Sequence, residues 1–144
     1  MLVQQILQGK SAEGVVTVPP GTTVSKAAEV LSTQRIGALI VSVDGKKVAG
    51  ILSERDIVRE LGRHGASCLG KTVDSIMTVK IVGCATSDSA DQVMQKMTDG
   101  RFRHMPVMQG DQMIGLISIG DVVKARLGEL AMEKDALEGM IKGF

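Results

Sequence analysis

The chain carries the sequence GILSERD at residues 50–56 and a second version of it, GLISIGD, at residues 115–121. Both copies follow one pattern, which is glycine, two apolar residues, serine, two variable residues and aspartate. An apolar run that leads into Ser-x-x-Asp is typical of a strand followed by a helix, because the hydroxyl and the carboxylate can cap the first backbone N–H groups of the helix. Capping is therefore the first role that we consider for the serine and aspartate of each copy.

The two motifs end a longer internal repeat, in which residues 15–58 align with residues 81–123. Val24 aligns with Ala90 at an offset of 66 residues, whereas Gly50 aligns with Gly115 at an offset of 65. One residue is lost at the turn between two expected strands, where a deletion costs least. A repeat of this length indicates that one structural unit, here β-α-β-β-α, is used twice.

Each copy begins with a short β-rich run, residues 15–18 and 81–84, and continues into a helical pattern. We expect the helix caps at Thr22 or Thr23 in the first copy and between Ser87 and Ser89 in the second. Apolar residues then recur with i, i+3, i+4, i+7 spacing, which predicts one buried helix face. Gly100 stands where a glycine C-cap of the second helix is expected.

Two strands and a turn follow each helix. Residues 38–43 and 47–52 flank Asp44-Gly45, and residues 104–109 and 113–118 flank Gly110-Asp111. Dipeptides of this kind between apolar runs predict hairpins. We expect a short helix after Thr72 in the linker, residues 62–78, with the Thr72 hydroxyl as its cap.

The last helix is expected to run past the repeat. Its apolar side chains form a stripe among charged residues: Leu127, Leu130, Leu137, Met140, Ile141 and Phe144. Such a stripe needs a partner, which could be the core of this module or a second chain. The sequence leaves both alternatives open.

The composition excludes several classes of protein. Of the 144 residues 44% are hydrophobic and 23% are charged, as in ordinary globular chains. The net charge of +1 and the aromatic content of 1% argue against nucleic-acid binding as the function. Cys68 and Cys84 have neither CxxC spacing nor a histidine cluster nearby, so we expect no metal site and no disulfide. No apolar run reaches membrane-spanning length and no signal peptide is evident, so we expect a cytoplasmic protein.

The doubled motif within paired β-α-β-β-α units resembles the CBS-domain pair, or Bateman module. Residues 36–41, residues 102–107 and the Asp74–Thr78 run are similar to other parts of that family's pattern. The resemblance implies an α+β fold in which two CBS repeats pack around a pseudo-two-fold axis, with extra N- and C-terminal helical segments. We expect residues 1–70 to hold repeat 1 with the N-terminal segment, and residues 71–144 to hold repeat 2 with the C-terminal helix.

The resemblance also implies a ligand: AMP, ADP, ATP or NAD(H), or S-adenosylmethionine in some members. The motif acid would hold the ribose, the motif hydroxyl would lie near ribose or phosphate, and the first strand's backbone would hold adenine. Apolar side chains would line the clefts, and cations would contact phosphate. The expected nucleotide-binding residues are Lys10, Val15, Val16, Ala38, Leu39, Ile51, Ser53, Arg55, Asp56, Thr78, Ile81, Val82, Arg103, His104, Met105, Pro106, Leu116, Ser118, Gly120 and Asp121.

The two expected clefts are chemically unequal, because Glu54-Arg55 in the first motif is replaced by Ile119-Gly120 in the second. We therefore predict that the cleft with Asp121, completed by Lys10, Val16, Ala38 and His104, binds nucleotide best. The chain shows no nucleophile–His–acid set, no P-loop and no G-x-G-x-x-G after a strand, so we expect no enzyme and no catalytic cofactor.

The leading hypothesis is a regulatory nucleotide sensor that forms a homodimer and acts in trans on an unknown effector protein. The alternative is a structural dimerisation module without a physiological ligand.

Overall fold

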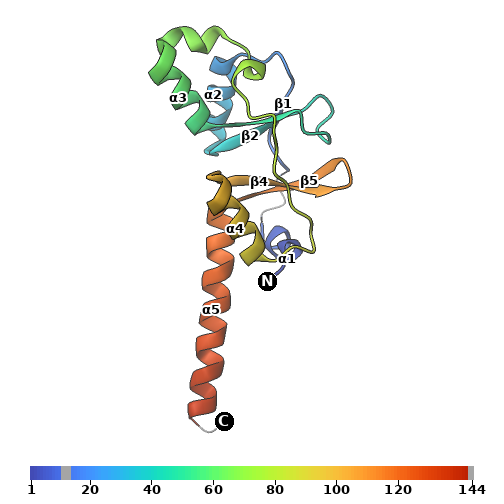
Figure 1. Cartoon of the computed structure of the whole chain (residues 1–144), viewed down its shortest axis with the longest axis vertical. Helices are drawn as coiled ribbons and strands as arrows, with labels where there is room; N and C mark the ends of the chain where they lie inside the picture. The colour runs from blue at the N-terminus through green and yellow to red at the C-terminus, as the bar shows by residue number, and fades with distance from the viewer. Residues whose placement is uncertain (11–13, 143–144) are drawn as a thin grey trace. The chain divides into compact units, whose positions relative to one another are not determined.

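The computed structural model describes residues 1–10 and 14–142, which form two compact α+β units. One unit comprises residues 14–82 and 109–114, and therefore holds most of the first repeat. The other comprises residues 1–10, 83–108 and 115–142, and holds most of the second repeat. The expected α+β class with two related repeats is confirmed by this architecture (Figure 1).

The first-repeat unit contains a three-stranded sheet in the order β1-β2-β3. The strands are β1 (Thr17–Val18), β2 (Ala38–Val41) and β3 (Gly50–Ser53); β1 runs parallel to β2, and β3 runs antiparallel to it. Helix α2 (Val24–Gln34) joins β1 to β2, and helix α3 (Glu54–His64) follows β3. The core forms where α2 and the sheet bury their apolar faces against each other.

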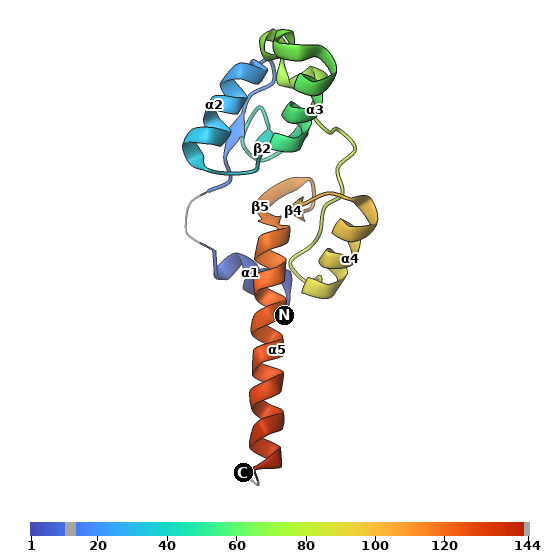
Figure 2. The same ribbon diagram turned by 90° about the vertical axis from the view of Figure 1, so that its left-hand side faces the viewer.

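The second-repeat unit is built in the same way. Cys84 bridges Val107 in the parallel sense, as Val18 does with Val41 in the first repeat. Helix α4 (Ala90–Gly100) leads into the hairpin of β4 (His104–Gln109) and β5 (Gln112–Ser118). Helix α5 (Ile119–Ile141) then continues as one helix beyond the repeat, as expected (Figure 2).

A leader segment completes each unit. Val24 of α2 donates its N–H to the carbonyl of Lys71, and Ala90 of α4 donates to the carbonyl of Met1, so residues 71–78 and 1–10 have equivalent positions. A Cβ atom on Gly50 would clash with Met77, and one on Gly115 would clash with Leu7. A leader side chain therefore lies directly over each motif glycine, and it would have to shift to make room for a larger residue. Each repeat packs with the leader that precedes the other repeat in the sequence.

Most helix boundaries follow the expected capping chemistry. Thr23 and Ser89 cap α2 and α4 through their hydroxyl oxygens. The prediction of Gly100 as a C-cap was wrong: it is the last residue of α4, and Arg101 takes the left-handed cap position, as Arg35 does after α2. A Cβ atom at position 100 would meet the Phe102 ring, so a larger residue there would force that ring to move.

The linker forms two short 3-10 helices, Gly65–Gly70 and Val73–Ser75, in place of an α-helix. The prediction that the Thr72 hydroxyl caps a helix was wrong, because the backbone of Thr72 instead bridges Thr23 and its carbonyl accepts from Ser75. The expected first strands are also shorter than their β-rich runs, with the second reduced to the single bridge at Cys84.

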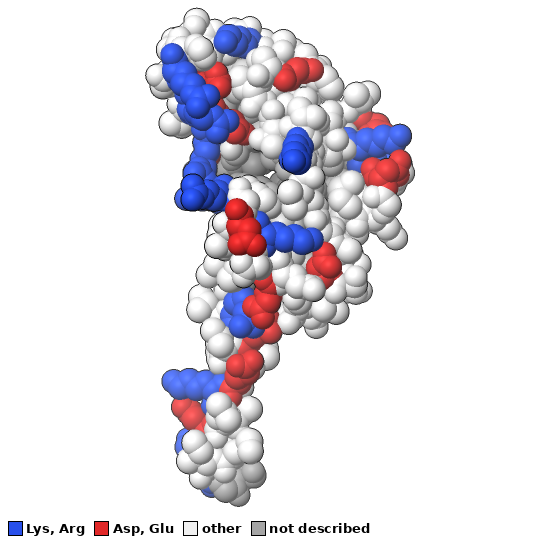
Figure 3. All heavy atoms as spheres, in the orientation of Figure 1, with Lys and Arg blue, Asp and Glu red and all other residues white. Residues whose placement is uncertain are grey.

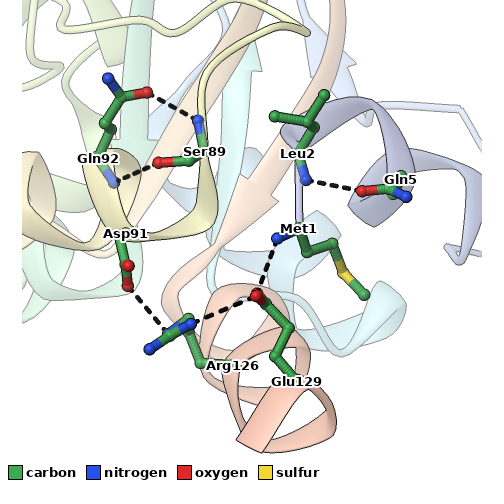
Figure 4. A network of polar contacts seen from close by, with 8 residues as sticks. All are labelled: Met1, Leu2, Gln5, Ser89, Asp91, Gln92, Arg126 and Glu129. Carbon is green, nitrogen blue, oxygen red and sulfur yellow. Dashed lines mark hydrogen bonds and ion pairs between the residues drawn. The ribbon is translucent and has the colours of Figure 1, made fainter. Parts of the chain in front are cut away.

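A polar network ties three helices of the second-repeat unit together (Figure 4). The Nε atom of Arg126 on α5 lies 2.9 Å from Oδ1 of Asp91 on α4. The α-amino group of Met1, which precedes α1 (Val3–Gln8), lies 2.9 Å from Oε2 of Glu129 on α5. The hydrogen bond from this amino group holds the pKa of Glu129 below its usual value. The network therefore fixes α1 and α4 against the first three turns of α5.

None of the described helices is long and apolar enough to cross a membrane. Residues 1–10 and 14–142 also contain no group of three or more His, Cys, Asp or Glu side chains that could hold a metal ion.

Candidate functional site

Each repeated motif forms a strand-to-helix junction with a complete capping box. Asp56 donates its backbone N–H to Oγ of Ser53 at 3.3 Å, and its carboxylate Oδ2 accepts the Ser53 N–H at 2.9 Å. At the second junction Asp121 and Ser118 exchange the same two bonds at 3.1 and 2.8 Å. Both serines and both acids therefore have the capping role that the motif predicts.

In the first repeat, the Asp56 carboxylate makes all of its hydrogen bonds to residues of its own helix and its cap. Oδ2 of Asp56 also accepts from the Ser53 hydroxyl at 3.1 Å, while Oδ1 accepts from Nη2 of Arg59 at 2.8 Å. The Asp56 side chain is only 10% exposed. Both oxygens of Asp56 are thus hydrogen-bonded and covered.

The second-repeat carboxylate has a different partner. Oδ2 of Asp121 accepts from Nζ of Lys10 at 2.8 Å, and the same ammonium donates to the carbonyl of Leu116 at 2.7 Å. The cation that contacts Asp121 therefore belongs to the leader, whereas the cation that contacts Asp56 belongs to the following helix. Oδ1 of Asp121 receives no hydrogen bond from residues 1–10 or 14–142, and the side chain is 26% exposed. This oxygen can accept a hydrogen bond from a ligand without displacing a cap.

Opposing effects act on the pKa of Asp121. Burial would raise it, but the hydrogen bonds from Lys10 and from the Ser118 backbone, with the Lys10 charge, leave the pKa below its usual value. The carboxylate is consequently charged at neutral pH, with an ammonium group beside it. A charged, partly exposed carboxylate such as that of Asp121 is a strong acceptor of hydrogen bonds from hydroxyl groups.

We predict that Lys10→Met raises the pKa of Asp121, because burial remains while the strongest pKa-lowering contact is lost. A depressed pKa in the folded state stabilises the fold above the unfolded-state pKa, about 3.9, and that contribution disappears as the pH falls through the folded-state value. In the variant the folded-state pKa of Asp121 lies closer to the unfolded-state value or above it, so this contribution should shrink or vanish. A ¹³C NMR titration of the aspartate carboxyl carbons measures the shift.

Lys80→Met is the matched control, because Lys80 is an exposed lysine two residues after the other leader. It should leave the Asp121 titration where it is in the parent. An Asp121 pKa that does not move in Lys10→Met would contradict the assigned contact.

The strand residues of the expected site divide between two sheet faces. In the β2–β3 pair Leu39 lies opposite Leu52, and both are fully buried in the first-repeat core. Ala38 lies opposite Ser53 and Ile51 lies opposite Ile40, on the other face. The alternation of side chains along a strand thus separates Leu39 from the motif serine.

The same division applies in the second repeat. Met105 is fully buried in that unit's core with Val107 and Ile117. By alternation Pro106, Leu116 and Ser118 face the other way. That Leu39 and Met105 line a ligand cleft stays a prediction; both side chains pack in the cores, whereas Ala38, Ile51, Pro106 and Leu116 lie on the motif face.

Backbone groups near the motifs also have defined partners. The carbonyl of Val16 accepts from the N–H of Ile40 at 3.1 Å, and Thr78 exchanges two backbone hydrogen bonds with Ile51. The carbonyl of Arg103 accepts from Ile119 at 2.8 Å, which fixes the start of α5. Among the other expected residues Val15, Ile81 and His104 are partly exposed, while Arg55, Val82, Arg103 and Gly120 are exposed.

Arg59 was missed by the sequence analysis. Its guanidinium contacts Asp56 from three residues further along α3, which is the ordinary spacing of side-chain pairs on a helix. That spacing could have identified it. Lys124 is the equivalent residue of the second repeat, at the offset of 65, yet Asp121 pairs with Lys10 instead.

The described fold and junctions agree with the comparison to known families. The family profile described as CBS domain matches residues 11–63 and 73–128. The chain therefore belongs to the CBS-domain family, and it carries two CBS domains in tandem.

Several relatives cover most of the chain. CBS domain-containing protein CBSX3, mitochondrial, of Arabidopsis thaliana is 37% identical over 141 residues, which cover 94% of this chain and 68% of the relative. The crystal structure of the CBS-domain containing protein ATU1752 from Agrobacterium tumefaciens is 43% identical, with a TM-score of 0.80, over 87% of this chain and 98% of that one. The chain spans only 24% of another Arabidopsis relative, CBSCBSPB1.

Two more distant structures share the fold and were solved with ligands. CBS domain protein PAE2072 from Pyrobaculum aerophilum, complexed with AMP, has a TM-score of 0.77 at 23% identity and covers 92% of this chain and 99% of that one. The CBS domain pair of protein MJ0100, in complex with 5-methylthioadenosine and S-adenosylmethionine, has a TM-score of 0.77 at 22% identity, covering 90% and 98%.

Proposed function

We propose that this CBS-domain pair is a regulatory sensor that binds an adenosine nucleotide and passes the bound state to a partner protein in trans. The observation that carries the proposal is the Asp121 carboxylate, which is ionised, partly exposed and open at Oδ1. A carboxylate of this kind can accept hydrogen bonds from the hydroxyls of a ribose.

The contact between Lys10 and Asp121 supports a phosphate-bearing ligand. The ammonium lies 2.8 Å from the carboxylate, so an anionic group arriving beside it meets a cation and not a bare negative charge. The exposed Arg103 side chain belongs to the same unit and adds a second cation. The proposed ligands are AMP, ADP, ATP and NAD(H), and the adenosine ligands of PAE2072 and MJ0100 are of the same chemical class.

We predict that one of these nucleotides raises the melting temperature of the chain in a thermal-shift assay. A ligand at 100 times its dissociation constant stabilises the folded state by about 2.7 kcal/mol. For a chain of this size that corresponds to roughly 5–10 °C. AMP, ADP, ATP, NADH and S-adenosylmethionine belong on one plate, with guanosine nucleotides as the matched control for phosphate binding alone.

A panel in which none of the adenosine ligands changes the melting temperature would contradict the sensor proposal. It would favour the second candidate, a structural dimerisation module without a physiological ligand. That candidate is favoured by one observation, the exposed apolar side chains along α5.

We infer binding, not catalysis, as the role of the two motif acids. Each acid caps the helix of its own unit, and Asp56 has both oxygens engaged within α3 and its cap. A cytoplasmic location stays a prediction, since the Arabidopsis relative is named as mitochondrial.

A further inference from the structure

The C-terminal half of α5 is exposed on all sides. From Leu130 to Lys142 every residue is exposed except Gly139, which is half-buried. Figures 1 and 2 both show this half extending past α1 and α4 of its own unit. An isolated helix of about 12 residues is marginal in water, and Gly128 and Gly139 weaken it further. A partner is therefore needed to account for a helix of this length.

One face of α5 supplies the apolar surface for such a partner. Exposed apolar side chains recur at alternating spacings of three and four residues, interrupted by one lysine; we call this set the α5 stripe, and it consists of Val123, Leu127, Leu130, Lys134, Leu137 and Ile141. Leu127, Leu137 and Ile141 are 62%, 59% and 85% exposed. The spacing places Leu127, Lys134 and Ile141 at the a positions of a heptad repeat and Val123, Leu130 and Leu137 at the d positions.

The α5 stripe is not the face that α5 uses to pack on its own unit. Val122 and Ala125 are buried in the second-repeat core, and Arg126 and Glu129 belong to the polar network with α4 and Met1. At 3.6 residues per turn the stripe lies about 100° around the helix from this buried face. Both faces can therefore be occupied at once.

We propose that the α5 stripe is the seam of an antiparallel coiled coil formed with α5 of a second copy of this chain. The apolar residues from Val123 to Ile141 span about 27 Å of helix, which is long enough for more than two heptads. Figure 3 shows charges of both signs beside uncharged surface along α5, as expected for a seam with charged flanks.

The charges select the antiparallel orientation. In a parallel pair Lys134 would face Lys134 of the second copy, and Glu133 would lie beside Glu138 across the seam, so like charges would meet at both places. In the antiparallel pair with Leu127 opposite Leu137, Lys134 lies opposite Leu130, where its aliphatic stem can cover the leucine. Lys124 on one copy then flanks Glu138 on the other, which joins opposite charges twice by symmetry, whereas Glu133 meets Glu133 of the second copy only once.

The proposal does not depend on nucleotide binding, and its test is the mass of the full chain in solution. Multi-angle light scattering and sedimentation equilibrium should give a dimer for the parent. The double variant Leu130→Glu/Leu137→Glu should give a monomer. Met132→Glu is the matched control, because Met132 is 68% exposed on the opposite side of the same helix, and it should remain dimeric. Circular dichroism and thermal unfolding without ligand check that each variant is folded.

A monomeric parent would overturn the proposal, and so would a dimer that survives the double variant or dissociates equally in Met132→Glu. Orientation is tested with a short thiol-reactive cross-linker on Leu127→Cys and Leu137→Cys. An equimolar mixture of the two variants should cross-link, whereas each alone should not. Efficient cross-linking of Leu137→Cys with itself would show a parallel pair and overturn the antiparallel arrangement. The parent is the background control, because Cys68 and Cys84 are both buried.

Discussion

Asp121→Asn is expected to weaken binding of the preferred adenosine nucleotide by about 100-fold, which corresponds to about 2.7 kcal/mol. Hydrogen bonds to a charged acceptor contribute about 1.5–3 kcal/mol each, and asparagine removes the charge while keeping the shape of the side chain. The remaining oxygen of asparagine can still accept from the Ser118 N–H and cap α5. Isothermal titration calorimetry measures the affinity, and thermal unfolding without ligand reports any loss of the cap.

Asp56→Asn is the matched control, since Asp56 occupies the equivalent place in an equivalent capping box. Both oxygens of Asp56 are already engaged by Ser53 and Arg59, so the affinity should change by no more than about twofold. If Asp56→Asn lowered the affinity as much as Asp121→Asn, or if Asp121→Asn had no effect, the assignment of the better site to the second junction would be overturned.

The repeat and its local chemistry could be predicted from the sequence. The features that were predicted correctly depend on residues within about one helical turn of each other. They are the apolar spacing along α2 and α4, the caps at Thr23 and Ser89, and the two capping boxes. Such short-range effects are encoded locally, and the internal repetition supplied a second copy of each pattern. The fold class and the existence of two strand-to-helix junctions followed from them.

The contacts made by the leaders could not be derived in the same way. Residues 1–10 pack with the second repeat, and Lys10 reaches Asp121 across 111 positions of sequence. Lys10 was expected at the better site from the resemblance to CBS-domain pairs, but its bonds to the Leu116 carbonyl and the Asp121 carboxylate depend on chain topology. The exchange of leaders between the repeats likewise has no local signal.

The assignment of strand residues to a sheet face could not be made from the sequence either. An apolar run such as ALIV, residues 38–41, has no polar residue to mark which side chains face the helices, and all four are buried in the structure. Only the register of β2 against β3 shows that Leu39 shares a face with Leu52, while Ala38 shares one with Ser53. When a strand is buried on both faces, its sequence does not show which side chains face the helices; an alternating apolar and polar pattern would show this.

Leu39→Ala is accordingly expected to lower the free energy of unfolding by about 2–5 kcal/mol, the range for leucine truncations in packed cores. Leu39 is 0% exposed and packs in the same cluster as Val24 and Leu31 of α2. Urea denaturation followed by circular dichroism measures the loss. Val43→Ala is the matched control, because Val43 lies just past the end of β2 and is 83% exposed, so its truncation should change stability by less than about 0.5 kcal/mol.

The same variant separates a core residue from a ligand-contacting one, provided that nucleotide affinity is measured at a temperature where Leu39→Ala is still folded. A side chain that faces the helices can affect the ligand only through the fraction of folded chains, so the affinity per folded molecule should stay within about twofold of the parent. Ile51→Ala, on the face that carries Ser53, should show the opposite pattern, with a smaller loss of stability and a larger loss of affinity. If fully folded Leu39→Ala showed a large loss of affinity, Leu39 would be a residue of the ligand cleft. This result would contradict the register of β2 and β3, on which the face assignment depends.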